Sequence, residues 1–336
     1  MASYTGTAYG DVSPRVGIIA EVKMLEHAEP ILVLQKFGDP KPQPKNKGQT
    51  VKFRRPVPFA AATTPLTEGV TPAGKKMAYQ DVTVTMAQYG DFSELTDVIA
   101  DTHEDPVLQD MTMLLGEQAG ETFEILTWGV ISGGTSVIYA NGAARNAVNT
   151  AITLAKLRLA SRSLKAQRAK KITKILAPSV NVSTKPVEAA FVVVAHTDCE
   201  ADIRGLAGFK SVAEYGTRQP LCPEEIGSVE DFRFVLSPVL KSLPDAGGAK
   251  GSMVSTSGTN ADVYPMVVLA QNAFGIVPLK GNGGPGSIVP MILNPNTPRG
   301  GDPLGQRGSA SWKSWFAAVR LNELWMTRIE VAVTAL

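Results

Sequence analysis

Cysteine and histidine are scarce in this chain, which has two cysteines and three histidines among 336 residues. Cys199 and Cys222 are too few for the disulfide framework of a small secreted domain, so a reducing compartment is the expected setting. His27, His103 and His196 lack the spacing of a zinc site, which needs three or four converging ligands. The composition therefore argues against disulfide-stabilised and zinc-dependent proteins.

Long apolar runs and a strong net charge are also missing. The longest apolar runs, such as residues 190–195, are far shorter than the roughly 20 residues that cross a bilayer, so no membrane association is expected. A net charge of +2 predicts no overall attraction to nucleic acid. With 44% hydrophobic and 19% charged residues the chain can bury a sizeable core, and its length predicts two lobes or one elaborated domain.

The most regular pattern is a predicted helix over residues 104–132. Apolar side chains recur there at the three- and four-residue spacing of one helix face, as at Leu108, Met111 and Leu115. Pro106 suits the first turn, and Gly133 ends the pattern. Such a helix would be about 40 Å long at 1.5 Å per residue. It carries no catalytic pattern, so we interpret it as a structural spine.

Residues 38–76 differ in character from the rest, because they are rich in proline and lysine and contain few side chains that could enter a core. The flanking residues 49–53 and 79–89 alternate between polar and apolar side chains, as strands do. This pattern predicts a long two-stranded hairpin that projects from the body. Disorder of the same segment is the alternative that composition leaves open.

The remaining elements follow from shorter patterns. Residues 1–20 read as an arm without its own core, and residues 15–37 as a short helix interrupted by Pro30. A further helix is expected over 149–169, strands over 189–195, 231–236, 264–270, 275–281 and 312–333, and a turn-rich crossing over 281–311.

The charges are strongly segregated along the chain. Residues 78–143 contain eleven acids and no lysine or arginine, whereas residues 125–187 contain ten bases and no acid. Mutual neutralisation within one fold, or simple solvation, is one interpretation, since exposed pairs contribute only about 0–1 kcal/mol each. Recognition between identical copies, with the basic hairpin of one over the acidic spine of the next, is another. Contact of the basic block with nucleic-acid phosphates is the third.

The best candidate for catalysis is the segment that contains His196, Asp198 and Cys199, directly after a predicted buried strand. A cysteine nucleophile needs a base within reach, and His196 three positions earlier matches no arrangement that we know. The end of a strand and the cap of a helix at Thr197 or Asp198 explain the segment better. The glycine-rich stretches at 247–252 and 281–286 lack the strand-to-helix context of a phosphate loop.

Four stretches, in their order along the chain, resemble the major capsid proteins of tailed bacteriophages with the Hong Kong 97-type fold. Residues 65–97 (PLTEGVTPAGKK…ELTD) are similar to the extended loop of that family and the strand after it. Residues 190–216 and 227–240 (GSVEDFRFVLSPVL) look like strands and a helix of its axial domain. Residues 310–333 look like the terminal strand that returns to its peripheral domain.

The resemblance implies an α+β coat subunit with four parts. They are an N-terminal arm (1–37), an extended hairpin loop (38–92), a peripheral domain (93–145 and 306–336) with its spine helix at 104–132, and an axial domain (146–305). It also implies hexamers and pentamers of an icosahedral shell that encloses double-stranded DNA, with possible portal, scaffold and decoration proteins, assembled in the bacterial host cytoplasm and located in the virion capsid. No catalytic residue, cofactor or metal is expected.

From the charge pattern we expect inter-subunit contacts at two groups of residues. The candidate residues are Lys52, Arg54, Arg55, Glu68, Asp91, Glu94, Asp97, Glu117 and Glu121. Three other functions compete with the coat protein: an encapsulin-like compartment with the same fold, a decoration or tail-tube protein, and a hydrolase centred on His196 and Asp198. Decoration and tail-tube proteins are usually shorter and lack the spine.

Overall fold

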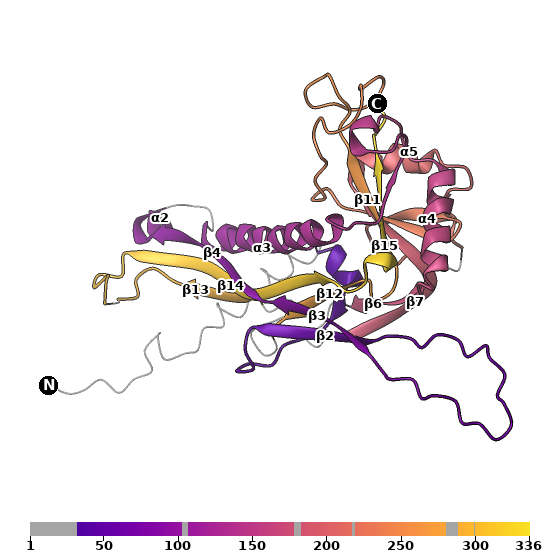
Figure 1. Cartoon of the computed structure of the whole chain (residues 1–336). Helices are drawn as coiled ribbons and strands as arrows, with labels where there is room; N and C mark the ends of the chain where they lie inside the picture. Colours follow the sequence, from indigo (N-terminus) through magenta and orange to yellow (C-terminus); the bar gives the residue numbers. More distant parts are fainter. Residues whose placement is uncertain (1–31, 103–106, 178–182, 217–218, 280–287, 299) are drawn as a thin grey trace.

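The computed structural model describes residues 32–102, 107–177, 183–216, 219–279, 288–298 and 300–336. Two sheets lie side by side, connected by a long helix, and a hairpin projects beyond them (Figure 1). The predicted N-terminal arm lies outside the described residues except for its end, where the 3-10 helix η1 spans Leu34–Phe37.

The predicted spine helix is confirmed as α3, Val107–Ser132. Its expected first residues, 104–106, lie outside the described part of the chain. The short helix α2, Asp97–Thr102, precedes it. Leu115, Ala119 and Phe123 are buried on one side of α3, as their spacing predicts.

The sheet beneath α3 has five strands. Its centre is the long strand β14, which pairs with β4 on one side and with β12 and β13 on the other, all antiparallel. The short strand β1 adds to β12 in parallel. The bounds are β1 Asp39–Pro40, β4 Ala87–Thr96, β12 Phe274–Pro278, β13 Val289–Leu293 and β14 Arg307–Arg320. Phe123 of α3 contacts Trp312 and Phe316 of β14, with ring centroids 5.8 and 4.9 Å apart.

The second sheet has eight strands in the order β5-β15-β11-β7-β10-β9-β8, with β6 beside β7. Strands β10 and β11 and residues 190–195 of β7, at the centre of this sheet, are buried on both faces, which explains their continuous apolar sequences. The bounds are β5 Val137–Tyr139, β6 Ile172–Ala177, β7 Ser183–Ala195, β8 Lys210–Ser211, β9 Glu225–Val229, β10 Phe232–Leu236, β11 Tyr264–Leu269 and β15 Met326–Val331.

Short helices accompany this sheet. They are η2 Arg145–Ala147, α4 Leu154–Ala166, η3 Thr197–Cys199, α5 Glu200–Arg204, η4 Val212–Glu214 and η6 Glu323–Trp325. Helix α4 buries Leu157 and Leu164 on the predicted face but is shorter than the expected 149–169. The expected helix after His196 is confirmed as η3 and α5.

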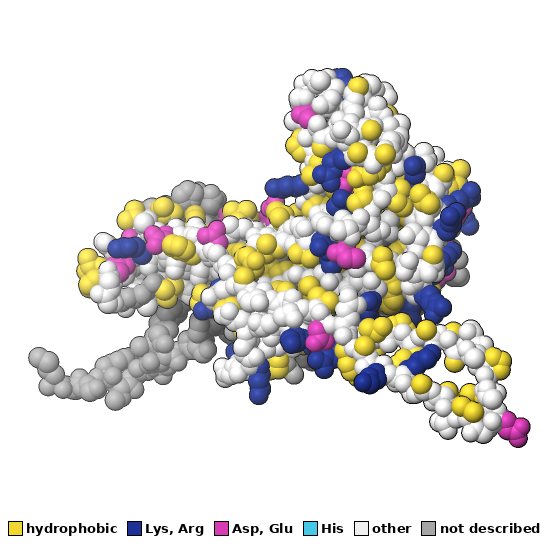
Figure 2. Space-filling model, viewed as in Figure 1, with side chains coloured by type: hydrophobic (Ala, Val, Ile, Leu, Met, Phe, Trp, Pro, Cys, Tyr) yellow, Lys and Arg dark blue, Asp and Glu magenta, His cyan; other side chains and the backbone are white. Residues whose placement is uncertain are grey.

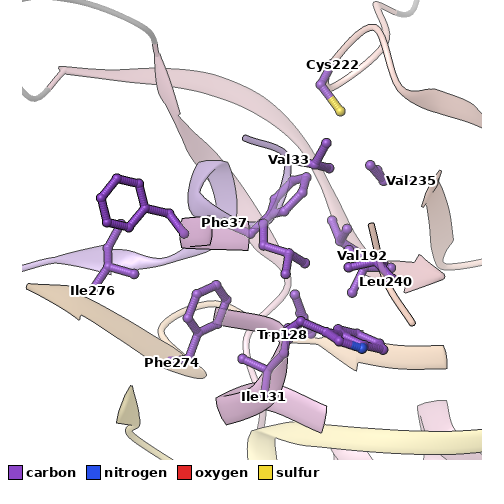
Figure 3. Packing of buried hydrophobic residues seen from close by; sticks show 14 of the residues in the cluster. Val33, Phe37, Trp128, Ile131, Val192, Cys222, Val235, Leu240, Phe274 and Ile276 are labelled. Atoms are coloured by element: carbon purple, nitrogen blue, oxygen red, sulfur yellow. The ribbon is translucent and has the colours of Figure 1, made fainter. Parts of the chain in front are cut away.

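One large apolar cluster joins the two sheets (Figure 3). In it, Phe37 of η1 packs among Trp128 and Ile131 of α3 and Val192 of β7. The end of the predicted arm is therefore part of the core that connects the spine to both sheets.

The prediction of one continuous strand over 312–333 is wrong. The chain leaves β14 after Arg320, turns through η6, and enters the other sheet as β15. Asn322 stabilises this turn, because its side chain accepts a hydrogen bond from the Leu324 amide at 3.2 Å. The crossing expected over 281–311 also contains β13 and the beginning of β14. The boundaries between peripheral and axial domains stay a prediction.

Candidate assembly surface

The predicted hairpin is present. Strands β2, Thr50–Pro56, and β3, Tyr79–Thr85, pair antiparallel from Thr50 opposite Thr85 to Pro56 opposite Tyr79. No other strand pairs with them among the described residues, and the hairpin leaves the body of the subunit in Figure 1. A two-stranded ribbon is marginal by itself in water, so its base must be held by packing.

A small apolar cluster provides that packing. Val51 and Phe53 on β2 and Met86 after β3 are buried against Val277 of β12. Phe53 also lies beside Gly275, where a Cβ atom would come within 2.8 Å of its ring. The base of the hairpin is therefore fixed on the five-stranded sheet.

Beyond this base, the distal loop, defined here as residues 57–78, is exposed throughout. Its side chains include several large apolar ones, such as Phe59, Leu66 and Val70, of which Leu66 is 78% exposed. Figure 2 shows apolar side chains spread over this loop and lysine and arginine side chains near its base. An isolated subunit thus presents apolar surface on an extension that has no core of its own.

The basic candidate residues all lie at the base of this hairpin, on β2, and are exposed. The structure adds a partner for two of them. Arg54 Nε and Asp81 Oδ1, on the paired strand, are 2.8 Å apart, and Arg55 Nη2 donates to Gln80 Oε1 at 2.6 Å. The pKa of Asp81 is lowered, chiefly by its hydrogen bond from Arg54. The expectation did not include these pairs within the hairpin.

The acidic candidate residues are spread over three elements. Asp91 and Glu94 lie on β4, Asp97 begins α2, and Glu117 and Glu121 lie on α3. Within the subunit, Asp91 Oδ2 accepts a hydrogen bond from Gln118 Nε2 at 2.6 Å. Glu68, in contrast, lies in the distal loop, so the structure does not place it with the other acids.

The two charged regions extend in different directions from the body. In Figure 1 helix α2, beside the acidic strand β4, points one way and the distal loop points the other way. Lys52, Arg54 and Arg55 are therefore presented on a different side from Asp97 of the same subunit, so any contact between these two groups has to join different copies.

Sequence reasoning missed an exposed apolar row on the face of the five-stranded sheet away from α3. Asp91 faces α3, so its neighbour Phe92 points to the opposite face because strand side chains alternate. Phe92 is opposite Ser311 on β14, and Ser311 is opposite Met291 on β13. Phe92 is 62% exposed, and Met291 and Leu293 are also exposed. The alternation in residues 87–96 was the signal that could have revealed Phe92.

The basic block on α4 is partly neutralised within the subunit. Arg158 Nη2 is 2.6 Å from Glu230 Oε1, and Asp231 receives both Lys165 and Lys171, at 2.5 and 2.7 Å. These pairs neutralise part of the basic block with acids outside residues 78–143, so they do not decide between the three interpretations of the charge segregation. Exposed Arg162 and Lys170 lie beside them.

The hydrolase candidate does not have the geometry of a catalytic site. The His196 Nδ1 atom accepts the Asp198 amide at 3.1 Å, which is the local cap of η3. The Asp198 carboxylate accepts from Tyr264 at 2.8 Å, and burial raises the pKa of the Cys199 thiol far above neutrality. A thiol that stays protonated is a poor nucleophile.

Across the described residues no cluster of three potential metal ligands occurs, and no helix is both long and apolar enough to span a membrane.

Comparisons with known proteins agree with this architecture. The model of a family described as phage capsid protein matches residues 79–329. The capsid of Ralstonia phage GP4 is similar with a TM-score of 0.67 and 12% identity, over 89% of this chain and 88% of the other. The capsid of cyanophage Pam1 has a TM-score of 0.58 and 12% identity, over 100% of both chains.

A third similar structure is the head of Helicobacter pylori bacteriophage KHP40, with a TM-score of 0.57 and 8% identity, over 89% of this chain and 88% of the other. No curated protein sequence matches the chain.

Proposed function

The chain belongs to the phage capsid protein family, and on this premise we propose that its copies form the hexamers and pentamers of an icosahedral shell around the double-stranded DNA of a tailed phage. It is a major capsid protein with the Hong Kong 97-like fold, located in the virion capsid, and not an enzyme. An encapsulin-like compartment is less favoured, because the family and the capsids of phages GP4 and Pam1 match instead.

The observation that carries the proposal is the hairpin, whose base is buried on the subunit and whose distal loop is wholly exposed. Residues 57–78 carry apolar side chains that a monomer gains nothing by exposing. The row formed by Phe92, Met291 and Leu293 is a second exposed apolar surface, on the face of the five-stranded sheet away from α3. The hairpin of one copy lies across this row on the next copy and covers both apolar surfaces at once.

Charge complementarity sets the orientation of this contact. The hairpin base presents Lys52, Arg54 and Arg55, while the strand that carries Phe92 also carries Glu94 and leads into Asp97. Charged groups at the rim of an interface fix register and speed association more than they add affinity. Asp91, Glu117 and Glu121 lie on the α3 side of the same sheet, where they contact a different neighbouring copy, and Glu68 contacts a neighbour from the distal loop.

The remaining partners follow from the resemblance and from the basic block. Exposed Arg162 and Lys170 contact DNA phosphates without sequence preference. Portal, scaffold and decoration proteins complete the shell, and assembly takes place in the cytoplasm of the bacterial host.

Negative-stain electron microscopy of the purified chain tests the proposal. We expect closed shells or rings of hexamer size, and a variant that lacks residues 59–76 should remain as folded, unassembled subunits. A chain that stays monomeric at all protein and salt concentrations would overturn the proposal.

A further inference from the structure

Glu124, in the middle of α3, is fully buried, with 0% of its surface exposed. Its two carboxyl oxygens lie 3.0 and 3.2 Å from the backbone nitrogen of Leu34, which donates to them. A buried carboxyl without close charge compensation is unfavourable, so its position needs a structural reason.

The reason lies in the segment that Glu124 holds, residues 33–37, at the beginning of the described chain. The 3-10 helix η1 begins there, and Val33 at its N-cap has no side chain able to satisfy the first amides. The carboxyl of Glu124, 90 residues away in the chain, accepts the Leu34 amide and so acts as the missing cap. Val33, Leu34 and Phe37 are then buried between α3 and both sheets (Figure 3).

The charges around Glu124 do not neutralise it directly. Among the described residues, Lys36 of η1 and Glu224 of the loop before β9 are the charged groups that act on it. The Lys36 ammonium donates to the two oxygens of Glu224, at 2.9 and 3.0 Å. It is therefore bound directly to Glu224 and acts on Glu124 only from a greater distance. Cys222 lies near the same loop, and burial raises its pKa to about 12, so its thiol stays neutral. Burial is the main cause that raises the pKa of Glu124 to about 8.

We propose that Glu124 is a pH-sensitive latch, which holds residues 33–37 against the spine helix while it is protonated and releases them when it ionises. A second observation shows that the contact is not fully satisfied. The side-chain nitrogen of Gln35 in the same segment is buried and finds no hydrogen-bond partner among the residues that the structure describes, which lowers the net stability of the docked segment. The latch therefore controls how firmly residues 33–37 are attached to the spine helix.

The direction of the pH effect follows from linkage. A carboxyl with a raised pKa binds its proton more tightly in the docked state than in the released state. Docking is strongest below the ordinary carboxyl pKa of 4.5, weakens as the pH rises, and levels off above about 8. Within this window the ratio of docked to released segment falls by up to about tenfold per pH unit.

Hydrogen–deuterium exchange of the full 336-residue chain between pH 5 and pH 9 tests the latch, with each rate corrected for the intrinsic effect of pH. We expect the protection of peptides covering residues 32–38 to fall with rising pH, and to return when the pH is lowered. Residues 192–194 of β7, which are buried in the eight-stranded sheet, should keep the same protection at every pH. Glu124→Gln should make the protection of 32–38 independent of pH, whereas Asp110→Asn, an exposed acid on the same helix, should behave like wild type.

Two further variants keep the test decisive if Glu124→Gln does not fold. Lys36 lowers the pKa of Glu124 and Glu224 raises it. Lys36→Met should therefore make the loss of protection larger and let it continue to higher pH before it levels off, and Glu224→Gln should make it smaller and let it level off at lower pH. Protection of residues 32–38 that does not change with pH in the wild type, or a profile that neither variant shifts, would overturn the proposal.

Discussion

The ring of Phe53 lies so close to Gly275 that a Cβ atom at position 275 would be 2.8 Å from it. Phe53 belongs to the projecting hairpin and Gly275 to β12 of the five-stranded sheet. The absence of a side chain on Gly275 therefore allows the hairpin base to dock. In the proposed assembly the hairpin joins subunits, so this contact fixes the direction in which the hairpin projects from the subunit.

Gly275→Val tests the contact. The new side chain has to displace Phe53, and overpacking of this kind costs about 1–3 kcal/mol. We expect a lower free energy of unfolding, measured by denaturant titration, and loss of exchange protection in residues 50–56. Gly129→Ala is a suitable control, because that position is an exposed helix residue with open space around it and should gain roughly 0.5–1 kcal/mol. Undiminished protection of residues 50–56 in Gly275→Val would contradict the role of the contact.

The C-terminal end of the spine helix depends on distant arginines. The last turn of α3 has no basic residue of its own, yet Arg320 Nη1 donates to the Val130 carbonyl at 2.9 Å. Arg328, which lies on β15, donates to the Ser132 carbonyl. These cations satisfy free carbonyls and complement the negative end of the helix dipole.

We therefore expect Arg320→Met, which also removes the ion pair with Glu323, to lower the free energy of unfolding by about 1.5–3 kcal/mol, the contribution of a hydrogen bond to a charged group. Calorimetry of the variant beside Lys313→Met, an exposed cation on the same strand, checks this. Equal melting temperatures for the two variants would show that Arg320 does not support the helix end.

Asp231 forms ion pairs with two lysines, Lys165 and Lys171, so part of the free energy of unfolding depends on pH. Hydrogen bonds from Lys165 and Lys171 lower the pKa of Asp231 below its ordinary value of 3.8. Its contribution is therefore present above that value and is lost as the pH falls through the lowered pKa. Asp231→Asn should lower the melting temperature at pH 7 but have a much smaller effect near pH 2. An equal effect at both pH values would contradict the assignment.

The sequence predicted the elements whose signal is local. The three- and four-residue spacing around Leu115 gave α3, and the alternation in 49–53 and 79–89 gave the hairpin. It did not predict the break between β14 and β15, because the alternation that ends at Leu321 was extended across Asn322 and Glu323, two consecutive polar residues that interrupt it. Only the pairing of the two strands in different sheets separates them.

The candidate surface was predicted in part for a similar reason. Charge segregation identified Lys52 and Glu94 as members of opposite groups, but no sequence pattern pairs Arg54 with Asp81 across the hairpin. The burial of Glu124 was also not predictable, since an acid on a helix face reads as solvent-exposed. Its partner, the Leu34 amide, is 90 residues away in the chain.

The most direct test of the assembly account is a charge reversal at the hairpin base, Lys52→Glu with Arg54→Glu and Arg55→Glu. Sedimentation and electron microscopy should find folded subunits that do not close into shells, since the reversed strand repels Glu94 and Asp97 of the next copy. Circular dichroism checks the fold, and reversal of the exposed Lys210, Lys241 and Lys250 is the matched control. Adding Glu94→Lys and Asp97→Lys to the reversed chain should restore assembly. Normal shells from the reversed chain would contradict the account.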